Sequence, residues 1–183
     1  TGTTGSRQGL QFRELGTLGG SGSIIGIKGR VTVLNAVVQD CPANPLTGTN
    51  IRARAQIIGW FFNDGSSTGP TDDTGNVIVG LQLVKEADGS NQIQPFLQKC
   101  TTASCSTVVN PVTVPPLTIV NTWSPSTAVV VKIAWDRVNG KFKVAVMDTG
   151  TLAVESIDIV YQGIVTDAGA PVNGDFKNLR VSN

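Results

Sequence analysis

The sequence predicts an all-β fold, an antiparallel β-sandwich or jelly roll of about 10–13 strands with little or no helix. Val, Ile and Thr together make up 56 of the 183 residues, and their β-branched side chains fit a pleated sheet better than a helix. Segments that alternate apolar and polar residues are separated by turns rich in Gly, Pro and Asn. No segment combines a helical period with a cap at each end. We therefore expect one sandwich domain over residues 19–183, preceded by an extended segment over residues 1–18.

In the N-terminal half, strands are expected at Leu10–Leu15, Ile24–Val38, Ile51–Phe62 and Asn76–Lys85. The third of these has the clearest pattern, because apolar residues alternate with Arg52 and Arg54, which face the opposite side. From Ile58 to Phe62 both faces are apolar, which predicts burial on two sides or a bulge at this end of the strand.

In the C-terminal half, extended segments are expected at Gln92–Lys99, Val108–Val109, Val112–Val120, Ala128–Asp136, Lys141–Asp148, Glu155–Tyr161 and Asp175–Ser182. A turn at Asp88-Gly89 precedes the first of them. The dipeptide Asn139-Gly140 predicts a hairpin with a type I′ turn, which requires a positive φ at both residues. Alternation through Val129 and Val131 places Trp135 in the core, and we also assign Trp60 to the core.

Three cysteines bear on the compartment of the protein. Cys100 and Cys105 lie at the two ends of a short polar loop, so a hairpin there would bring them within disulfide distance. The alternative is a pair of reduced surface thiols. Zinc is not expected, because three cysteines without His or a fourth Cys lack the usual ligand count. A disulfide implies an oxidising compartment, and Cys41 would then be buried as a free thiol or paired with another chain.

The composition excludes several classes of function. The chain contains no His, so it cannot hold an imidazole base or a His-ligated metal. Lys plus Arg is 14 and Asp plus Glu is 13, so we expect no nucleic-acid partner. No run of 18 apolar residues is present, so we expect no insertion into a membrane.

The C-terminal third of the chain resembles the concanavalin A-like lectin/glucanase superfamily, including its laminin-G-like bacterial extracellular modules. The resemblance is carried by the apolar strand ending in Trp135-Asp136, the Asn139-Gly140 hairpin, and the closing segment DFKNLRVSN at residues 175–183. The resemblance covers residues 120–183. The first half of the chain agrees with the superfamily only in its number of expected strands and in the strand with the sequence RARAQ. It implies a jelly roll of two curved antiparallel sheets in a secreted or cell-surface bacterial protein.

The resemblance also implies where catalytic groups would lie. Glucanases of this fold place two Glu and one Asp close together on one strand, whereas Glu14, Glu86 and Glu155 lie far apart in this sequence. Lyases of this fold use a His or Tyr base, and Tyr161 is the single Tyr. We therefore expect no catalytic residues and predict that the protein is not an enzyme.

Three groups of residues are candidates for ligand binding. Four oxygen-bearing side chains crowd the loop NDGSSTGPTDDTGN and suggest a structural Ca²⁺ site, namely Asp64, Asp72, Asp73 and Asn76. The alternative is a solvated loop that uses these residues for turns. Trp123 precedes Ser-Pro-Ser and is expected to be the most exposed ring, suited to stacking on a sugar. Arg52 and Arg54 would recognise an acidic sugar or pair with carboxylates across the sheet.

Together these observations predict a non-catalytic structural or adhesive protein, such as a self-assembling subunit of a surface appendage. The alternative is a carbohydrate-binding, lectin-like module of a secreted protein. No cofactor is expected apart from structural Ca²⁺. The expected partners are glycans and other copies of the chain, with residues 1–18 pairing with the sheet edge of a neighbouring copy.

Overall fold

The computed structural model describes residues 7–13, 25–38, 52–172 and 176–182. These residues contain ten strands and no helix, which confirms the all-β expectation. The strands are β1 (Arg7–Arg13), β2 (Gly26–Thr32), β3 (Arg52–Asn63), β4 (Asn76–Glu86), β5 (Asn91–Cys100), β6 (Val108–Val109), β7 (Ala128–Asp136), β8 (Lys141–Asp148), β9 (Val154–Val160) and β10 (Phe176–Ser182). No helix long and apolar enough to cross a membrane occurs in the described ranges.

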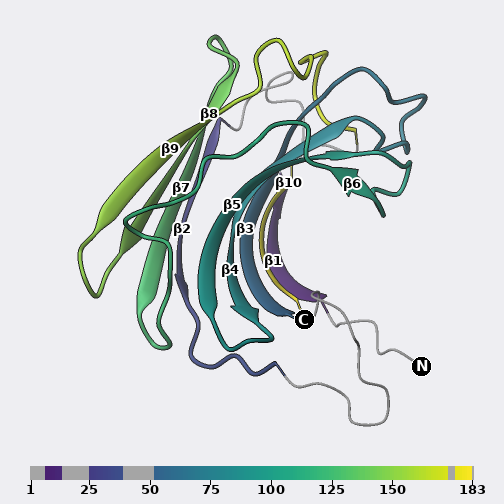
Figure 1. Cartoon of the computed structure of the whole chain (residues 1–183). Coiled ribbons are helices and arrows are strands. Elements are labelled where there is room, and N and C mark those ends of the chain that lie inside the picture. Colours follow the sequence, from purple (N-terminus) through teal and green to yellow (C-terminus); the bar gives the residue numbers. More distant parts are fainter. Residues whose placement is uncertain (1–6, 14–24, 39–51, 173–175, 183) are drawn as a thin grey trace, which may run out of the picture.

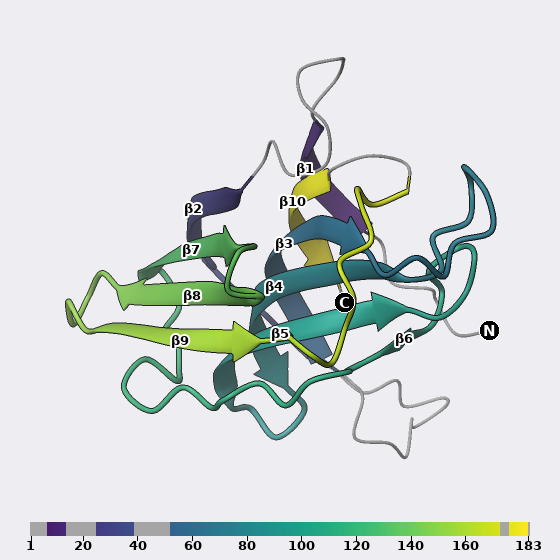
Figure 2. The same cartoon turned by 90° about the horizontal axis from the view of Figure 1, so that it is seen from above.

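Two antiparallel sheets face each other. The larger has six strands in the order β1-β10-β3-β4-β5-β6, and the smaller has four in the order β2-β7-β8-β9. The six-stranded sheet is strongly curved, with its convex side against the smaller sheet and its concave side open (Figure 1). Viewed from above, the smaller sheet ends in two edge strands, β2 and β9 (Figure 2). The expected pair of curved sheets is therefore confirmed.

Strand β3 contains the expected irregularity. Its pairing with β4 runs in regular register from Arg52 to Trp60 and then shifts by one residue, so that Phe62 rather than Phe61 faces Val77. This bulge points both Phe61 and Phe62 into the core, where they are 1% and 0% exposed. The bulge thus explains why Phe61 and Phe62 both enter the core, while Ile58 is buried in a second apolar cluster on the other face of the strand.

The β7–β8 hairpin forms where expected, but its turn differs from the prediction. Asp136 pairs with Lys141, so four residues form the loop, and a positive φ occurs at Gly140 but not at Asn139. The carboxylate of Asp136 accepts hydrogen bonds from the backbone and side-chain N–H groups of Asn139. This Asp–Asn contact stabilises a longer loop than the two-residue type I′ turn.

Two expected strands are shorter than predicted or absent. The apolar run from Ile24 yields only β2, which ends at Thr32. The segment Val112–Val120 forms no strand, because Pro115 and Pro116 lack the N–H groups that a ladder needs. It still packs on the sandwich, since Leu117 and Val120 are buried in the core.

The core between the sheets includes a cluster of aromatic rings. Trp135 is buried there as predicted and stacks on Phe62 and Phe142. Tyr161 contacts the same two phenyl rings. The single Tyr is therefore part of the core and does not lie in an open site where a base would meet a substrate.

At the N-terminal edge of the larger sheet, β1 pairs in antiparallel fashion with β10 of the same chain, from Arg7 opposite Ser182 to Arg13 opposite Phe176. Residues 1–6 and 14–18 lie outside the described residues. The expected exchange of residues 1–18 between copies stays a prediction.

Candidate functional site

The concave face of the six-stranded sheet carries polar side chains on three adjacent strands, β3, β4 and β5. Strands β3, β4 and β5 alternate, so that residues such as Ile57, Leu81 and Ile93 enter the core. Their neighbours in sequence point to the opposite, concave side of the sheet, whose curvature Figure 1 shows. This arrangement places the polar positions of three consecutive strands side by side.

Three glutamines form a hydrogen-bonded row across this face. Gln56 lies directly opposite Gln82, and Gln82 lies opposite Gln94. The Nε2 group of Gln56 donates to Oε1 of Gln82 at 3.0 Å, and Nε2 of Gln82 donates to Oε1 of Gln94 at 2.8 Å. We call these three residues the amide row. Because a primary amide has two N–H donors and an oxygen with two lone pairs, Gln56 and Gln82 each retain one N–H for a ligand.

The amide row ends at a carboxylate. Nε2 of Gln94 lies 3.5 Å from Oε1 of Glu86, the last residue of β4, and also donates to Oε1 of Gln92. Glu86 lies opposite Arg52 on β3, and the closest approach between the two charged groups is 4.0 Å. A hydrogen-bond donor, a carboxylate and a guanidinium therefore lie together at one end of the row.

The other half of the concave face is apolar. Ile58, Ile78 and Cys100 form a small buried cluster, against which Trp60 and Phe96 pack. Gly80 lies between Ile58 and Phe96 in the sheet, and a Cβ added there would meet Phe96 Cζ at 2.6 Å and Ile58 Cγ2 at 2.7 Å. The absence of a side chain at Gly80 is what lets these two residues close over the strand.

A loop turns this face into a groove. The cavity has a volume of about 620 Å³, and its lining includes the amide row, both arginines of β3 and Phe96. The segment Asn110–Val114, which follows β6, supplies the opposite lining. We call this cavity the concave groove. Its lining is mostly polar, with Phe96 and Leu97 among the apolar residues.

The residues that were predicted to bind ligands do not lie together in the structure. Arg52 and Arg54 line the concave groove, while their recognition of an acidic sugar stays a prediction. Trp123, which was expected to be an exposed ring, is only 3% exposed, and its indole N–H donates to the carbonyl of Val84. That expectation of exposure is wrong, because the segment after Pro115-Pro116 folds back onto the sheet. Trp60, assigned to the core, is instead half-buried on the concave side.

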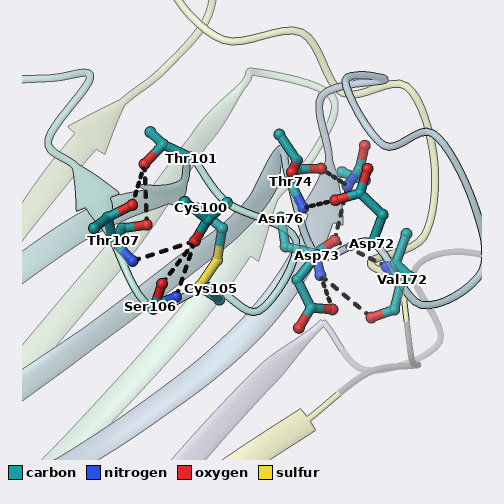
Figure 3. Close-up of a disulfide and its surroundings, with 12 residues drawn as sticks. Asp72, Asp73, Thr74, Asn76, Cys100, Thr101, Cys105, Ser106, Thr107 and Val172 are labelled. Atoms are coloured by element: carbon teal, nitrogen blue, oxygen red, sulfur yellow. Dashed lines mark hydrogen bonds between the residues drawn. A yellow bond between two sulfur atoms is a disulfide. The ribbon is translucent and has the colours of Figure 1, made fainter.

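The proposed calcium loop is held by its own hydrogen bonds (Figure 3). Asp72 accepts from the backbone and hydroxyl of Thr68 and from the backbone of Thr74, and hydrogen bonds from Thr74 and Thr68 hold its pKa well below the usual value. Asp64 forms an ion pair with Lys99 at 2.9 Å. Asp73 accepts a hydrogen bond from Asn76.

Buried amides secure the base of the same loop. Nδ2 of Asn63 donates to Oδ1 of Asn76 at 2.8 Å, and the backbone N–H of Val172 donates to that same oxygen. Both asparagine side chains are buried. Among the described residues, no three or more Asp, Glu, Cys or His side chains are grouped to hold a metal ion. Calcium binding here stays a prediction, and turn chemistry accounts for the interactions of the loop.

The expected disulfide is present between Cys100 and Cys105 (Figure 3). Cys100 is fully buried and its carbonyl accepts the N–H of Gly75. The carbonyl of Ala103 accepts the N–H of Asp73. The cross-linked loop therefore fastens the loop at residues 64–76 to the end of β5. Cys41 lies outside the described residues.

Sequence reasoning missed the glutamines of the amide row. Each occupies a polar position in a strand that was correctly identified, but only the register of three strands shows that they meet. A signal was present in the sequence, since Gln56, Gln82 and Gln94 share the outward-facing phase of their strands. Glu86 entered the sequence analysis only in the comparison with the glucanase motif, where no second carboxylate was found near it in the sequence.

Comparison with protein-family models gives no match, and no curated protein matches either. Among solved structures, the chain is similar to scytalido-glutamic peptidase with a transition-state analogue inhibitor, with a TM-score of 0.52 and 7% identity, over 97% of this chain and 65% of that one. The same peptidase with a peptide-based transition-state analogue gives 0.50 and 9%, over 97% and 64%. The chain thus spans about 65% of the peptidase.

A third similar structure is peanut lectin with a 9-residue peptide. It aligns over 97% of this chain and 96% of the lectin at 12% identity, but the TM-score of 0.29 is too low to indicate a shared fold. The expectation that this protein is not an enzyme must be corrected, because the fold it shares at a TM-score of 0.52 is that of a glutamic peptidase. The absence of a glucanase motif excluded one class of carboxylate enzyme only.

Proposed function

We propose that the concave groove binds an extended peptide and that the protein is a peptidase in which Glu86 is the catalytic carboxylate. The observation that carries the proposal is the hydrogen-bonded amide row ending at Glu86, on the concave face of a sheet. Solved structures with this fold include glutamic peptidases, one of them with a peptide-based transition-state analogue.

The amide row matches the hydrogen-bonding needs of a peptide backbone. Each peptide unit offers one N–H and one C=O, and Gln56 and Gln82 each have a spare N–H within the row. Adjacent strands are about 4.8 Å apart, so a peptide lying across β3 and β4 would meet one amide per strand. Binding through the backbone in this way is tolerant of the peptide's sequence.

Hydrolysis would need a base and a group that stabilises the oxyanion. The carboxylate of Glu86 would take a proton from water as the water oxygen attacks the peptide carbonyl, and would return it to the leaving amine. The Nε2–H of Gln94 that points at this carboxylate would turn to the developing oxyanion as the carboxylate takes up the proton. Glu86 is not among the residues that line the groove, but Arg52, which does line it, would hold the carboxylate at the edge of the groove.

Trp60 offers a direct test of peptide binding. Trp123 and Trp135 are buried, whereas Trp60 packs beside the groove and is half-buried. A library of short peptides titrated into the protein should change the tryptophan fluorescence, and Trp60→Phe should abolish that change without abolishing binding. Gln82→Leu, which interrupts the amide row, should weaken binding at least tenfold. Unchanged affinity in Gln82→Leu would contradict the proposed role of the row.

Glycan binding is the second candidate. It is supported by the position of Phe96, a half-buried ring two residues from Gln94 on the same face of β5, because sugar sites combine ring faces with amide groups. A glycan array would separate the two candidates. Glycan affinity that is lost in Phe96→Ala, with no affinity for peptides, would favour the lectin-like function.

Two broader expectations belong to the same proposal. The Cys100–Cys105 disulfide supports an oxidising, extracellular location. An adhesive role as a self-assembling surface subunit stays a prediction, and electron microscopy of the native material would test it. Filaments that form from the intact chain, and fail to form without residues 1–18, would support it.

A further inference from the structure

The outer face of the four-stranded sheet carries a group of cations remote from the concave groove. Lys28 and Arg30 lie on β2, Lys132 on β7 and Lys143 on β8, and all four are exposed. We call these four residues the cationic face. Their strands are adjacent in the sheet, and Figure 2 shows β2, β7 and β8 side by side on the side away from β3 and β4.

Two of these cations are directly opposed. Lys28 faces Lys132 in the β2–β7 register, and like charges at opposed positions destabilise a sheet. None of the four residues forms an ion pair or side-chain hydrogen bond within the part of the chain that the structure describes. An anion that binds between Lys28 and Lys132 would relieve the repulsion between these two opposed cations, whereas Lys143 faces Asp158 on β9.

The cations follow a diagonal line across the sheet. Lys132 and Lys143 are diagonal neighbours, because Lys132 faces Ala145 and Lys143 faces Ala134. Lys141, two residues before Lys143 on β8, extends the line and pairs with Asp158 at 2.8 Å. With strands about 4.8 Å apart and about 3.3 Å per residue, the line from Arg30 to Lys141 spans roughly 22 Å. Such a line fits a linear polyanion better than a single small anion.

The chemistry of the face favours a polysaccharide over a nucleic acid. The outward positions beside the cations are mostly small or aliphatic, for example Val130, Ala134, Ala145 and Met147, and two are acidic, namely Asp136 opposite Lys141 and Asp158 opposite Lys143. Single-stranded nucleic acids are usually bound through aromatic rings that stack on bases, and no ring occupies an outward position on β2, β7, β8 or β9.

We propose that the cationic face binds a linear acidic polysaccharide, through carboxylate or sulfate groups that lie between Lys28 and Lys132 and along the diagonal to Lys143. This site is independent of the concave groove and of the proposed peptidase function. It would attach the protein to an acidic matrix while leaving the groove open.

The test measures binding of the full chain to four polyanions of similar length. These are a heparin oligosaccharide, an oligogalacturonate, single-stranded DNA and polyglutamate, with dextran as the neutral polymer. We expect the chain to bind one or both acidic polysaccharides at 50 mM NaCl. The result also identifies the group, because heparin presents mainly sulfate and oligogalacturonate only carboxylate.

Variants then locate the site. Lys28→Gln combined with Lys132→Gln should lower the affinity at least tenfold and reduce the slope of log K against log salt by about two, one for each charge removed. The control is Lys85→Gln, which removes one charge from the β4 end of the larger sheet, so its effect is compared per charge removed. Thermal melting should show that the double variant is at least as stable as the wild type, because the opposed like charges are gone.

Several outcomes would overturn the proposal. One is the absence of binding to both acidic polysaccharides at 50 mM NaCl, and another is equal affinity in the double variant and the wild type. A loss in Lys85→Gln that is half as large on a logarithmic scale as the loss in the double variant would show that only total charge matters. Tighter binding to DNA or polyglutamate than to either polysaccharide would contradict the assignment of the partner.

Discussion

The indole N–H of Trp135 donates a 2.8 Å hydrogen bond to the hydroxyl oxygen of Tyr161, and both side chains are buried. The bond joins the end of β7 to the residue that follows β9, so it ties two strands of the smaller sheet across the intervening β8. Burial raises the pKa of Tyr161, so the hydroxyl stays protonated well into the alkaline range.

Removing the ring of Trp135 should be strongly destabilising. Trp135→Ala is expected to lower the free energy of unfolding by about 3–5 kcal/mol, as for other large core aromatics. Tyr161→Phe, which leaves the indole N–H without its acceptor, should cost about 1–3 kcal/mol. Urea denaturation measures both, with Val138→Ala as the control because Val138 is 90% exposed. A loss below about 1 kcal/mol for Trp135→Ala would contradict burial of the ring.

Glu155 should make stability depend on pH. Its carboxylate accepts hydrogen bonds from the backbone N–H groups of Thr118, Ile119 and Val120. Burial by itself raises the pKa of Glu155, but these hydrogen bonds together outweigh burial and hold the pKa below the usual 4.5. A carboxyl with a lowered pKa contributes stability above the unfolded-state pKa and loses that contribution as pH falls through the folded-state value.

Glu155→Gln should therefore be less stable than the wild type at pH 7, and the difference should shrink at pH 3. Urea denaturation at the two pH values measures this. The same difference at both pH values would show that the carboxylate charge does not hold the segment after Pro116.

The disulfide should stabilise the end of β5. For a loop this short, the chain-entropy estimate is about 2 kcal/mol. We expect Cys100→Ser combined with Cys105→Ser to lower the melting temperature, and reductant to lower that of the wild type but not of the double variant. Peptide mapping without reduction should find Cys100 linked to Cys105. A peptide that links Cys41 to either residue would contradict the pairing.

Gly80 should be intolerant of side chains. A Cβ at this position would lie 2.8 Å from the carbonyl oxygen of Ile57, a backbone atom that cannot easily move, as well as against Phe96 and Ile58. Gly80→Ala should lower the free energy of unfolding by about 1–3 kcal/mol, as expected for overpacking. Gly69→Ala is the matched control, since a Cβ there would meet nothing within 4 Å. Equal stability of the two variants would show that the concave face can repack.

Most strands were predictable from sequence because their signal is local. The alternation that ends in Trp135 depends on a single strand and its buried face, and so does the apolar run that becomes the bulge at Phe61. The turn at Asn139-Gly140 was predicted with the wrong type, because the Asp136 carboxylate lies outside the dipeptide that was considered. The break at Pro115 and Pro116 was recognised in the sequence. Burial of Trp123, however, depends on where the following segment packs on the sheet, and no local sequence pattern predicts that position.

The candidate site was not predictable in the same way. Gln56, Gln82 and Gln94 are separated by 26 and 12 residues, and only strand register makes them neighbours. The cations Lys28 and Lys132 are likewise far apart in the chain. The nearly neutral net charge gave no indication of this group of cations. A net charge adds up all charged residues and does not say on which face of the fold each one lies.

Peptide hydrolysis by Glu86 tests the central claim most directly. A mixed peptide library would be incubated with the wild type, with Glu86→Gln and with Asp158→Asn, and the products would be read by mass spectrometry between pH 3 and pH 7. Asp158 is a carboxylate of the opposite sheet and serves as the control. We predict cleavage by the wild type and by Asp158→Asn, and a loss of at least a hundredfold in Glu86→Gln with the fold retained. No cleavage by the wild type at any pH, or undiminished cleavage by Glu86→Gln, would contradict the assignment.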